Sequence, residues 1–283
     1  MSIRSIGIVG GGSAGFLCGL ALKRKLPHLE VTLIKSEQIP IIGVGEATTW
    51  SVPGFLHDYL GNAETLNLDR SPYLPRTGGE PQLAGPIGYH IENESFVGFL
   101  EKTATAEGVR VLDRLIKEFP LAEDGSLAAL ALDDGSLVRF DLYIDCSGFR
   151  SRLLGGALGV PFVSYASSLF CDRAVVGGHA RGDLPVKPYT GSATMSAGWS
   201  FVTEHWDRVN LGYVFSSKHI ADADADRELR AFCGGRLDRT RIVPFTSGRY
   251  ARAWEKTCGT AAHALSMEAA FEQLSGTPAR AAG

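Results

Sequence analysis

Hydrophobic positions near the start of the chain predict a strand, a helix and a second strand. Residues 3–9 indicate a buried strand, and residues 13–26 carry apolar side chains at the spacing of a helix. Pro27 ends this helix, because proline disfavours helical geometry in the residue before it. Residues 29–34 combine β-branched and apolar side chains, which is typical of a strand. This order predicts a right-handed β-α-β unit.

The pattern beyond this unit predicts an α/β chain without repeats. Residues 61–88 are rich in proline, glycine and polar residues, have no clear period and predict a loop or a remodelled region. The other predicted elements are a short helix at 52–60, a helix from 94 to about 107 capped by Asn93, a strand at 109–115, a β-meander with tight turns at 124–125 and 134–135, a buried strand at 141–145, further β-structure over 161–217 and a helix at 221–232.

Composition narrows the class of protein. The 283 residues are 45% hydrophobic and 21% charged, which is typical of a globular protein with a real core, and the net charge of −3 provides no basic surface for nucleic acid or a membrane. Five dispersed cysteines without a CxxC pair indicate reduced thiols and offer no metal site. Glycines interrupt the apolar stretch at 6–22, so we expect a cytoplasmic protein without a targeting segment, a membrane span or a nucleic-acid partner.

A glycine loop between the first strand and the first helix predicts dinucleotide binding. In Gly10-x-Gly12-x-x-Gly15, the first glycine permits a tight turn, the second lets a pyrophosphate approach the backbone, and the third lets the helix pack on the strand. The helix start, including Ser13 and Ala14, offers N–H groups and a positive dipole end to phosphates. The alternative is a purely structural glycine turn.

Lys35 stands where an acidic residue is expected. Dinucleotide folds of this kind place an acid about twenty residues after the loop, where it binds a ribose hydroxyl. Here Lys35 takes that place, with Glu37 just beyond. Lysine there is compatible with contact to a 2′-phosphate, and the alternative is a solvated lysine at the end of a strand.

Four motifs together resemble one family. They occur in order as Ser36-x-x-Ile39-Pro40-x-Ile42-Gly43-Val44-Gly45-Glu46-Ala47-Thr48, Tyr89-His90 before the helix near Asn93, Asp141-Leu142-Tyr143-Ile144-Asp145-Cys146-Ser147-Gly148-Phe149-Arg150, and Gly212-Tyr213-Val214-Phe215-Ser216-Ser217. From residue 3 to about 255, the chain resembles the flavin-dependent halogenases, the tryptophan-halogenase-like family.

The resemblance implies a fold and a cofactor. It implies a Rossmann-like FAD-binding domain of the aromatic-hydroxylase type with an interleaved β-sheet substrate domain, here at 1–155 and 156–235, and a C-terminal segment at 236–283 that returns to the FAD domain. Besides the glycine loop and Lys35, the residues that it places at FAD are Gly43, Gly45, Glu46, Ala47, Leu115 and Asp145.

The resemblance also implies a reaction. Reduced FAD, supplied by a separate flavin reductase, forms a flavin hydroperoxide with oxygen. Chloride or bromide attacks it and yields hypohalous acid, and a buried lysine then delivers the halogen to a small aromatic substrate such as an indole, a pyrrole or a phenol. The protein's part is to exclude water and to position the partners.

Two departures weaken this expectation. No lysine occurs between Lys35 and Lys102, where the delivery lysine should stand, and Arg70 and Arg76 are poor substitutes because arginine stays protonated. The catalytic residue is therefore unknown. The family's Trp-x-Trp-x-Ile-Pro signature reads Trp199-Ser200-Phe201-Val202-Thr203-Glu204 here, and Trp199 is either part of a tunnel wall or a core aromatic.

The C-terminal stretch leaves three functions open. The family's glutamate-proline-leucine element and its helical substrate region are missing after Trp254, so we expect an incomplete C-terminal region, in which Glu272 has no assigned role. The chain is a halogenase, an FAD-dependent monooxygenase on the same fold, or an inactive flavin-binding remnant. Product formation with and without halide separates the first two, and failure to retain FAD indicates the third.

Overall fold

The fold consists of two compact units, each made of segments that are distant in sequence. The computed structural model describes residues 3–43, 46–49, 51–56, 73–74, 82–83, 88–187 and 189–250. Unit 1 comprises the described residues of Met1–Ile42, Val97–Val163 and Gly248–Gly283, and unit 2 comprises those of Gly43–Phe96 and Ser164–Ser247. The predicted boundaries at residues 155 and 235 stay a prediction.

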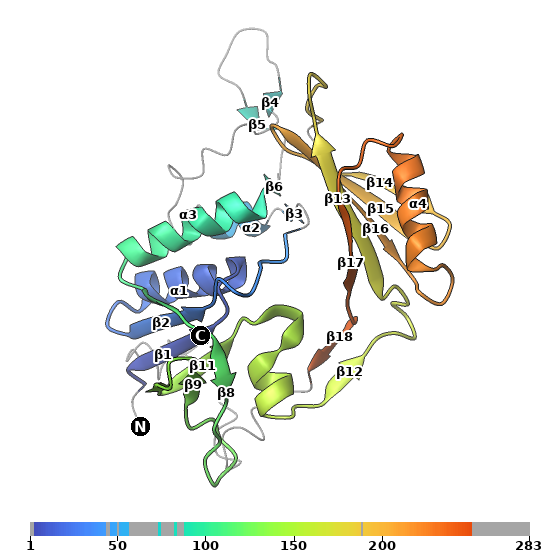
Figure 1. The fold of residues 1–283 in the computed structure, drawn as a ribbon. Coiled ribbons are helices and arrows are strands. Elements are labelled where there is room, and N and C mark those ends of the chain that lie inside the picture. Colours follow the sequence, from blue (N-terminus) through green and yellow to red (C-terminus); the bar gives the residue numbers. More distant parts are fainter. Residues whose placement is uncertain are drawn as a thin grey trace, which may run out of the picture. The chain divides into compact units, whose positions relative to one another are not determined.

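Unit 1 is built on a parallel sheet of four strands. In spatial order these are β11 (Leu142–Asp145), β1 (Ser5–Val9), β2 (Glu30–Lys35) and β7 (Arg110–Asp113), and each neighbouring pair is parallel. The helix α1 (Ser13–Lys25) connects β1 to β2, and α3 (Asn93–Ala106) precedes β7 (Figure 1). The predicted β-α-β unit is therefore present.

Alternation along β1 and β2 gives the parallel sheet two different faces. Ile8 and Leu33 lie near glycines of α1, whereas Val9 and Ile34 belong to a core cluster with Leu130 of the meander. The meander comprises β8 (Ile116–Glu118), β9 (Leu130–Leu132) and β10 (Leu137–Val138), in the order β10-β9-β8. Helix α1 thus covers one face and the meander the other, as Figure 1 shows. Both faces are buried, which explains the nearly continuous apolar character of these strands.

The chain leaves β11 through two short helical turns and a short strand pair. These are η2 (Gly148–Arg150), a 3-10 turn, η3 (Arg152–Ala157), a π-helical turn, and β12 (Phe162–Ser164), which pairs with β18 (Gly248–Tyr250). Ser151 between the two turns has φ +37°, which is unusual for a residue other than glycine.

Unit 2 is dominated by an antiparallel sheet of five strands. Its spatial order is β14 (Gly191–Met195), β15 (Gly198–Glu204), β16 (Arg208–Phe215), β13 (Arg173–Ala180) and β17 (Thr240–Pro244). The helix α4 (Asp222–Phe232) packs against one face, where Ala225 and Leu229 meet Val175, Leu211 and Tyr213 (Figure 1). All five of these side chains are buried.

Short elements complete unit 2. The strand β3 (Glu46–Ala47) pairs antiparallel with β6 (His90–Ile91), and β4 (Tyr73–Leu74) pairs with β5 (Gln82–Leu83). The helix α2 (Ser51–Gly54) covers the start of the predicted helix at 52–60, whose residues 57–60 lie outside the described part.

The predicted α/β class, with a parallel sheet and a separate β-sheet region, is confirmed. One strand differs from its prediction: the expected strand at 109–115 ends at Asp113, and a second strand starts at Ile116.

Within the described residues, no helix is both long and apolar enough to cross a bilayer. Four cysteines fall in that part and all are free thiols, of which Cys233 alone is buried.

Candidate cofactor site

The glycine loop has three glycines with three different surroundings. Gly10 has φ +121°, and a Cβ added to it would lie 2.2 Å from the backbone oxygen of Cys146. A Cβ on Gly15 would lie 2.0 Å from the backbone oxygen of Gly10, whereas a Cβ on Gly12 would meet no atom within 4 Å. Gly10 and Gly15 are therefore required by the packing of the protein itself. Gly12 leaves open backbone where a phosphate group fits.

The start of α1 favours an anion. Gly12 is the residue that caps the helix, and no acidic residue lies in the first turn of α1. Lys23, Arg24 and Lys25 occupy its last turn. The positive end of the helix dipole is thus not neutralised from within the helix, and N–H groups of the first turn point toward the glycine loop. This arrangement suits the pyrophosphate of a dinucleotide.

Lys35, at the end of β2, is held by an ion pair. Its Nζ lies 2.7 Å from Oε1 and 2.8 Å from Oε2 of Glu101, which is on α3. The Lys35 side chain is only 19% exposed, so it is not the solvated lysine of the second alternative. A Cβ added to Gly11 would lie 2.5 Å from the Cβ of Lys35, which places the pair directly beside the glycine loop.

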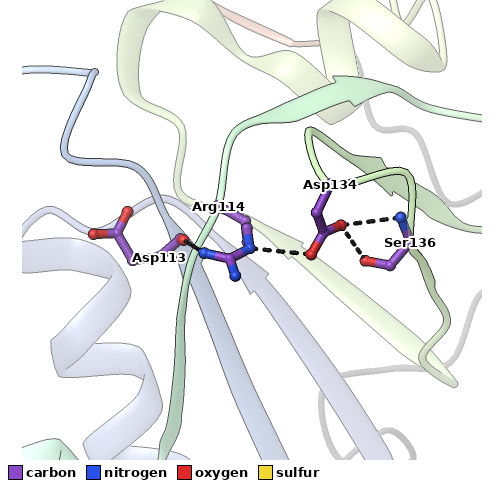
Figure 2. Close-up of polar contacts among 4 residues, drawn as sticks. All are labelled: Asp113, Arg114, Asp134 and Ser136. Carbon is purple, nitrogen blue, oxygen red and sulfur yellow. Dashed lines mark hydrogen bonds and ion pairs between the residues drawn. The ribbon is translucent and has the colours of Figure 1, made fainter.

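Arg114 organises the chain just after β7. Its backbone N–H donates to the backbone oxygen of Lys35 at 2.8 Å, and its Nη1 donates to that of Asp113 at 2.8 Å. Its Nε donates to Oδ2 of Asp134 at 3.1 Å, while Oδ1 of Asp134 accepts from the amide and the hydroxyl of Ser136 (Figure 2). This network ties the meander to the end of β7. The half-buried Leu115 follows immediately.

Asp145 stabilises the turn that follows β11. Its Oδ2 accepts from the amides of Leu153 and Leu154 at 2.9 and 3.0 Å, and its Oδ1 accepts from the amide and the hydroxyl of Ser147 at 3.0 and 2.5 Å. Asp145 pairs with Val9, and the Cys146 amide donates to the Val9 oxygen at 2.8 Å. The Asp145–Phe149 motif therefore lies beside the glycine loop, with the Asp145 carboxylate directed to the protein's own amides.

The Gly43–Thr48 motif is anchored within unit 2. Glu46 pairs with Ile91 and Ala47 with His90, and Thr48 exchanges hydrogen bonds with the Tyr89 backbone at 2.9 and 2.8 Å. The Gly43 oxygen accepts from Nη2 of Arg241 at 2.5 Å. Burial raises the pKa of Glu46. Gly45 lies outside the described residues, as do Arg70, Arg76 and Glu272.

The aromatic pair of the altered tryptophan signature lies on the face of the β13–β17 sheet away from α4. Ser200 pairs with Tyr213, which packs against α4, so the neighbouring Trp199 and Phe201 project to the other face. Trp199 is 46% exposed, and its ring centroid lies 6.1 Å from that of Phe201. The alternative that Trp199 is a core aromatic is therefore wrong. Glu204 is buried at 8% exposure, and its Oε2 accepts from the Lys187 amide at 3.0 Å.

Unit 1 therefore brings together Gly10, Gly12, Gly15, Lys35 and Asp145, although they come from separate stretches of sequence. The open backbone at Gly12 and the anion-favouring start of α1 fit the pyrophosphate of FAD. Sequence reasoning missed Glu101 and Arg114. A lysine at a position that normally holds an acid was the available signal for Glu101, because a partly buried ammonium needs a partner.

Comparison with known proteins agrees with these features. The model of the tryptophan halogenase family matches residues 5–84 and 74–266. The chain belongs to the tryptophan halogenase family. The two matched ranges overlap at residues 74–84, within the 61–88 stretch that the sequence singles out as irregular.

Individual members of the tryptophan halogenase family are similar over most of this chain. Tryptophan 6-halogenase SttH from Streptomyces toxytricini is 26% identical, over 89% of this chain and 65% of its own length. The crystal structure of MibH, a lanthipeptide tryptophan 5-halogenase, is 36% identical with a TM-score of 0.80, over 89% of this chain and 60% of MibH. BrvH, a flavin-dependent halogenase from Brevundimonas sp. BAL3, is 27% identical with a TM-score of 0.78, over 90% of this chain and 65% of BrvH.

The chain thus spans about 65% of the length of SttH. The alignment with SttH runs over 342 positions, which exceeds the 283 residues of this chain. SttH therefore has segments inside the matched range that this chain lacks.

Proposed function

We propose that this chain binds FAD and halogenates an aromatic ring, with reduced FAD from a separate flavin reductase and with chloride or bromide as co-substrate. The observation that carries the proposal is the open backbone at Gly12, in a glycine loop that starts a helix, within a member of the tryptophan halogenase family. Bound reduced FAD supplies the electrons that activate oxygen toward a halide.

The residues that hold FAD in this proposal fall into three groups. Gly10, Gly12, Ser13, Ala14 and Gly15 bind the pyrophosphate through backbone N–H groups and the dipole of α1. Lys35 and Leu115 lie toward the adenosine, and Asp145 holds the turn beside the loop. The Gly43–Thr48 motif supplies Gly43, Gly45, Glu46 and Ala47.

The residue that hands halogen to the substrate stays unassigned. The chain has no lysine between Lys35 and Lys102. Arginine does not replace it, since a guanidinium remains protonated and is a poor nucleophile.

The substrate class is an electron-rich aromatic ring. MibH is described as a lanthipeptide tryptophan 5-halogenase, SttH as a tryptophan 6-halogenase, and a relative from Pseudoalteromonas luteoviolacea, 28% identical over 66% of this chain, as a brominase of a carrier-bound pyrrole carbonyl. Indole and pyrrole rings recur in these descriptions. A test panel therefore contains free tryptophan, a tryptophan-containing peptide, a pyrrole and a phenol.

The test is a reconstituted reaction. The purified chain is supplied with FAD, a flavin reductase, NADH and either chloride or bromide, and products of the panel are identified by mass spectrometry. We expect halogenated phenol or indole with the wild-type chain. Gly12→Val is the matched control, because its added side chain takes the space proposed for the pyrophosphate, and it should yield none.

Other outcomes contradict the proposal in different ways. Hydroxylated product in halide-free buffer indicates a monooxygenase on the same fold. Loss of all flavin absorbance on desalting, together with no product in the reaction supplied with FAD, contradicts both enzyme activities and supports an inactive remnant.

A further inference from the structure

We propose that Glu101 accepts a hydrogen bond from the adenosine ribose of FAD and that Lys35 positions the Glu101 carboxylate for this contact. The inference rests on the proposed function, because it concerns the same cofactor. It assigns a specificity-determining residue to a helix, α3, where the sequence pattern places none.

The Lys35–Glu101 pair lies beside the glycine loop. In folds with this glycine loop, an acid at the end of the second strand binds the ribose about twenty residues after the loop. Lys35 occupies that position and cannot accept a hydrogen bond, since an ammonium group has donors only. The carboxylate of Glu101 lies 2.7 Å from the Lys35 Nζ. An acid from α3 therefore contacts Lys35 beside the glycine loop, and we assign it the role of the acid that β2 lacks.

The Glu101 carboxylate can accept more hydrogen bonds than the one ion pair uses. Both oxygens of Glu101 contact the Lys35 ammonium, at 2.7 and 2.8 Å. An ionised carboxylate has about four lone-pair sites, so the contact with lysine leaves sites for further donors. The Glu101 side chain is 32% exposed, which leaves it accessible from solvent. A ribose hydroxyl can thus donate to Glu101 while the ion pair remains intact.

The charge of the Lys35–Glu101 pair affects which kind of ribose it favours. A free lysine here would favour a 2′-phosphate on the ribose. Pairing with Glu101 balances the ammonium charge, so the pair attracts a dianionic phosphate less than a free lysine does. The pair therefore favours an unphosphorylated ribose, as FAD has, and the 2′-phosphate alternative is not the one that we propose.

Neighbouring groups keep the pair in place. The backbone oxygen of Lys35 accepts from the Arg114 amide at 2.8 Å, and Lys35 pairs in register with Asp113 on β7. The Asp113 carboxylate already accepts from the Glu37 amide at 3.1 Å. The Asp113 carboxylate therefore contacts the turn after β2, whereas Glu101 is the acid that contacts Lys35 beside Gly11, so Glu101 is the acceptor that we propose.

The test combines variants with altered cofactors. Affinities of the wild-type chain and of Glu101→Gln are measured by flavin fluorescence for FAD and for FAD analogues with 2′-deoxyadenosine or 3′-deoxyadenosine. Wild type should bind FAD about tenfold more tightly than at least one analogue, because a hydrogen bond to a charged group contributes about that much. Glu101→Gln should lose about threefold for FAD and discriminate less against that analogue, because a neutral amide oxygen accepts a weaker hydrogen bond than a carboxylate.

Two further variants separate positioning from structure. Glu118→Gln removes a carboxylate from an exposed site on β8 and should keep the wild-type affinities. Lys35→Gln should lose affinity for FAD and most of the discrimination against the analogue. The exchange variant, Lys35→Glu with Glu101→Lys, again places a carboxylate beside an ammonium. It should regain both the affinity for FAD and the discrimination against the analogue, whereas a pair that only stabilised the fold would give no such discrimination.

The outcomes distinguish the two proposals. If wild type binds FAD but does not discriminate against either analogue, or if Glu101→Gln binds FAD as wild type does, the role of Glu101 is wrong and the proposed function stands. If wild type binds no FAD, both are wrong.

Discussion

At the scale of single residues, the glycine loop separates structural from functional requirements. Gly10 and Gly15 have no room for a Cβ because backbone oxygens lie 2.2 and 2.0 Å from that position. Gly12 caps α1 and has room for a Cβ, so its open backbone leaves space for the approach of a ligand. The motif in the sequence identifies all three positions, but only the structure tells which substitution tests binding without disturbing the fold.

The first prediction compares Gly12→Ala with Gly15→Ala. Gly15→Ala forces a Cβ against the Gly10 oxygen, and we expect it to lower the free energy of unfolding by about 2 kcal/mol or more, as overpacking does. Gly12→Ala should lower it by no more than about 1 kcal/mol, because the added Cβ meets no atom and alanine is only a poorer helix cap than glycine. Urea unfolding followed by circular dichroism measures both, and equal losses of stability would contradict the contrast.

The second prediction concerns the carboxyl group of Asp134. Hydrogen bonds from the Ser136 hydroxyl and amide, together with Arg114, lower the pKa of Asp134 from 3.8 to about 2. Because the pKa in the folded state is depressed, the stabilisation is present above pH 3.8 and is lost as the pH falls through about 2. A carbon-detected NMR titration should give a pKa of about 2. Ser136→Ala should raise it toward the ordinary value, and an unshifted pKa in wild type would refute the network.

At the scale of secondary structure, long-range contacts decide what local pattern leaves open. Periodicity predicts a single strand over 109–115, yet β7 ends at Asp113 and the chain leaves the parallel sheet for the meander, whose strand β8 starts at Ile116. Periodicity likewise places a helix near 94–107 but does not tell that Glu101 meets Lys35, which lies 66 residues earlier. Such pairings depend on the order of strands in the sheet, and no local signal encodes it.

The third prediction concerns β16, whose partner strand β15 carries Trp199 and Phe201. The fully buried Tyr213 accepts a hydrogen bond on its hydroxyl from the Ala197 amide at 2.8 Å. Tyr213→Phe leaves that amide without this acceptor, so we expect a loss of about 1–3 kcal/mol in the free energy of unfolding. Tyr165→Phe, at an exposed side chain, is the matched control and should change it by less than about 0.5 kcal/mol. Equal effects of the two variants would contradict the role of this hydrogen bond.

At the scale of the whole molecule, each unit carries its own share of the family motifs. The glycine loop, Lys35 and Asp145 belong to unit 1, whereas the Gly43–Thr48 motif, Tyr89-His90 and Gly212–Ser217 belong to unit 2. The order of motifs in the sequence predicts the family and the α/β class, and the match to residues 5–84 and 74–266 confirms the family. The delivery residue was not predictable, because no lysine occurs where the family pattern requires it.

The central claim is that this tryptophan halogenase family member binds FAD on the glycine loop of unit 1. The most direct measurement is the FAD dissociation constant of wild type and of Gly12→Val, with circular dichroism to show that both are folded. We predict saturable binding to wild type and a loss of at least about tenfold in the folded variant, because the new side chain takes the space of the pyrophosphate. Equal affinity of the two folded proteins, or absence of FAD binding to wild type, would contradict the claim.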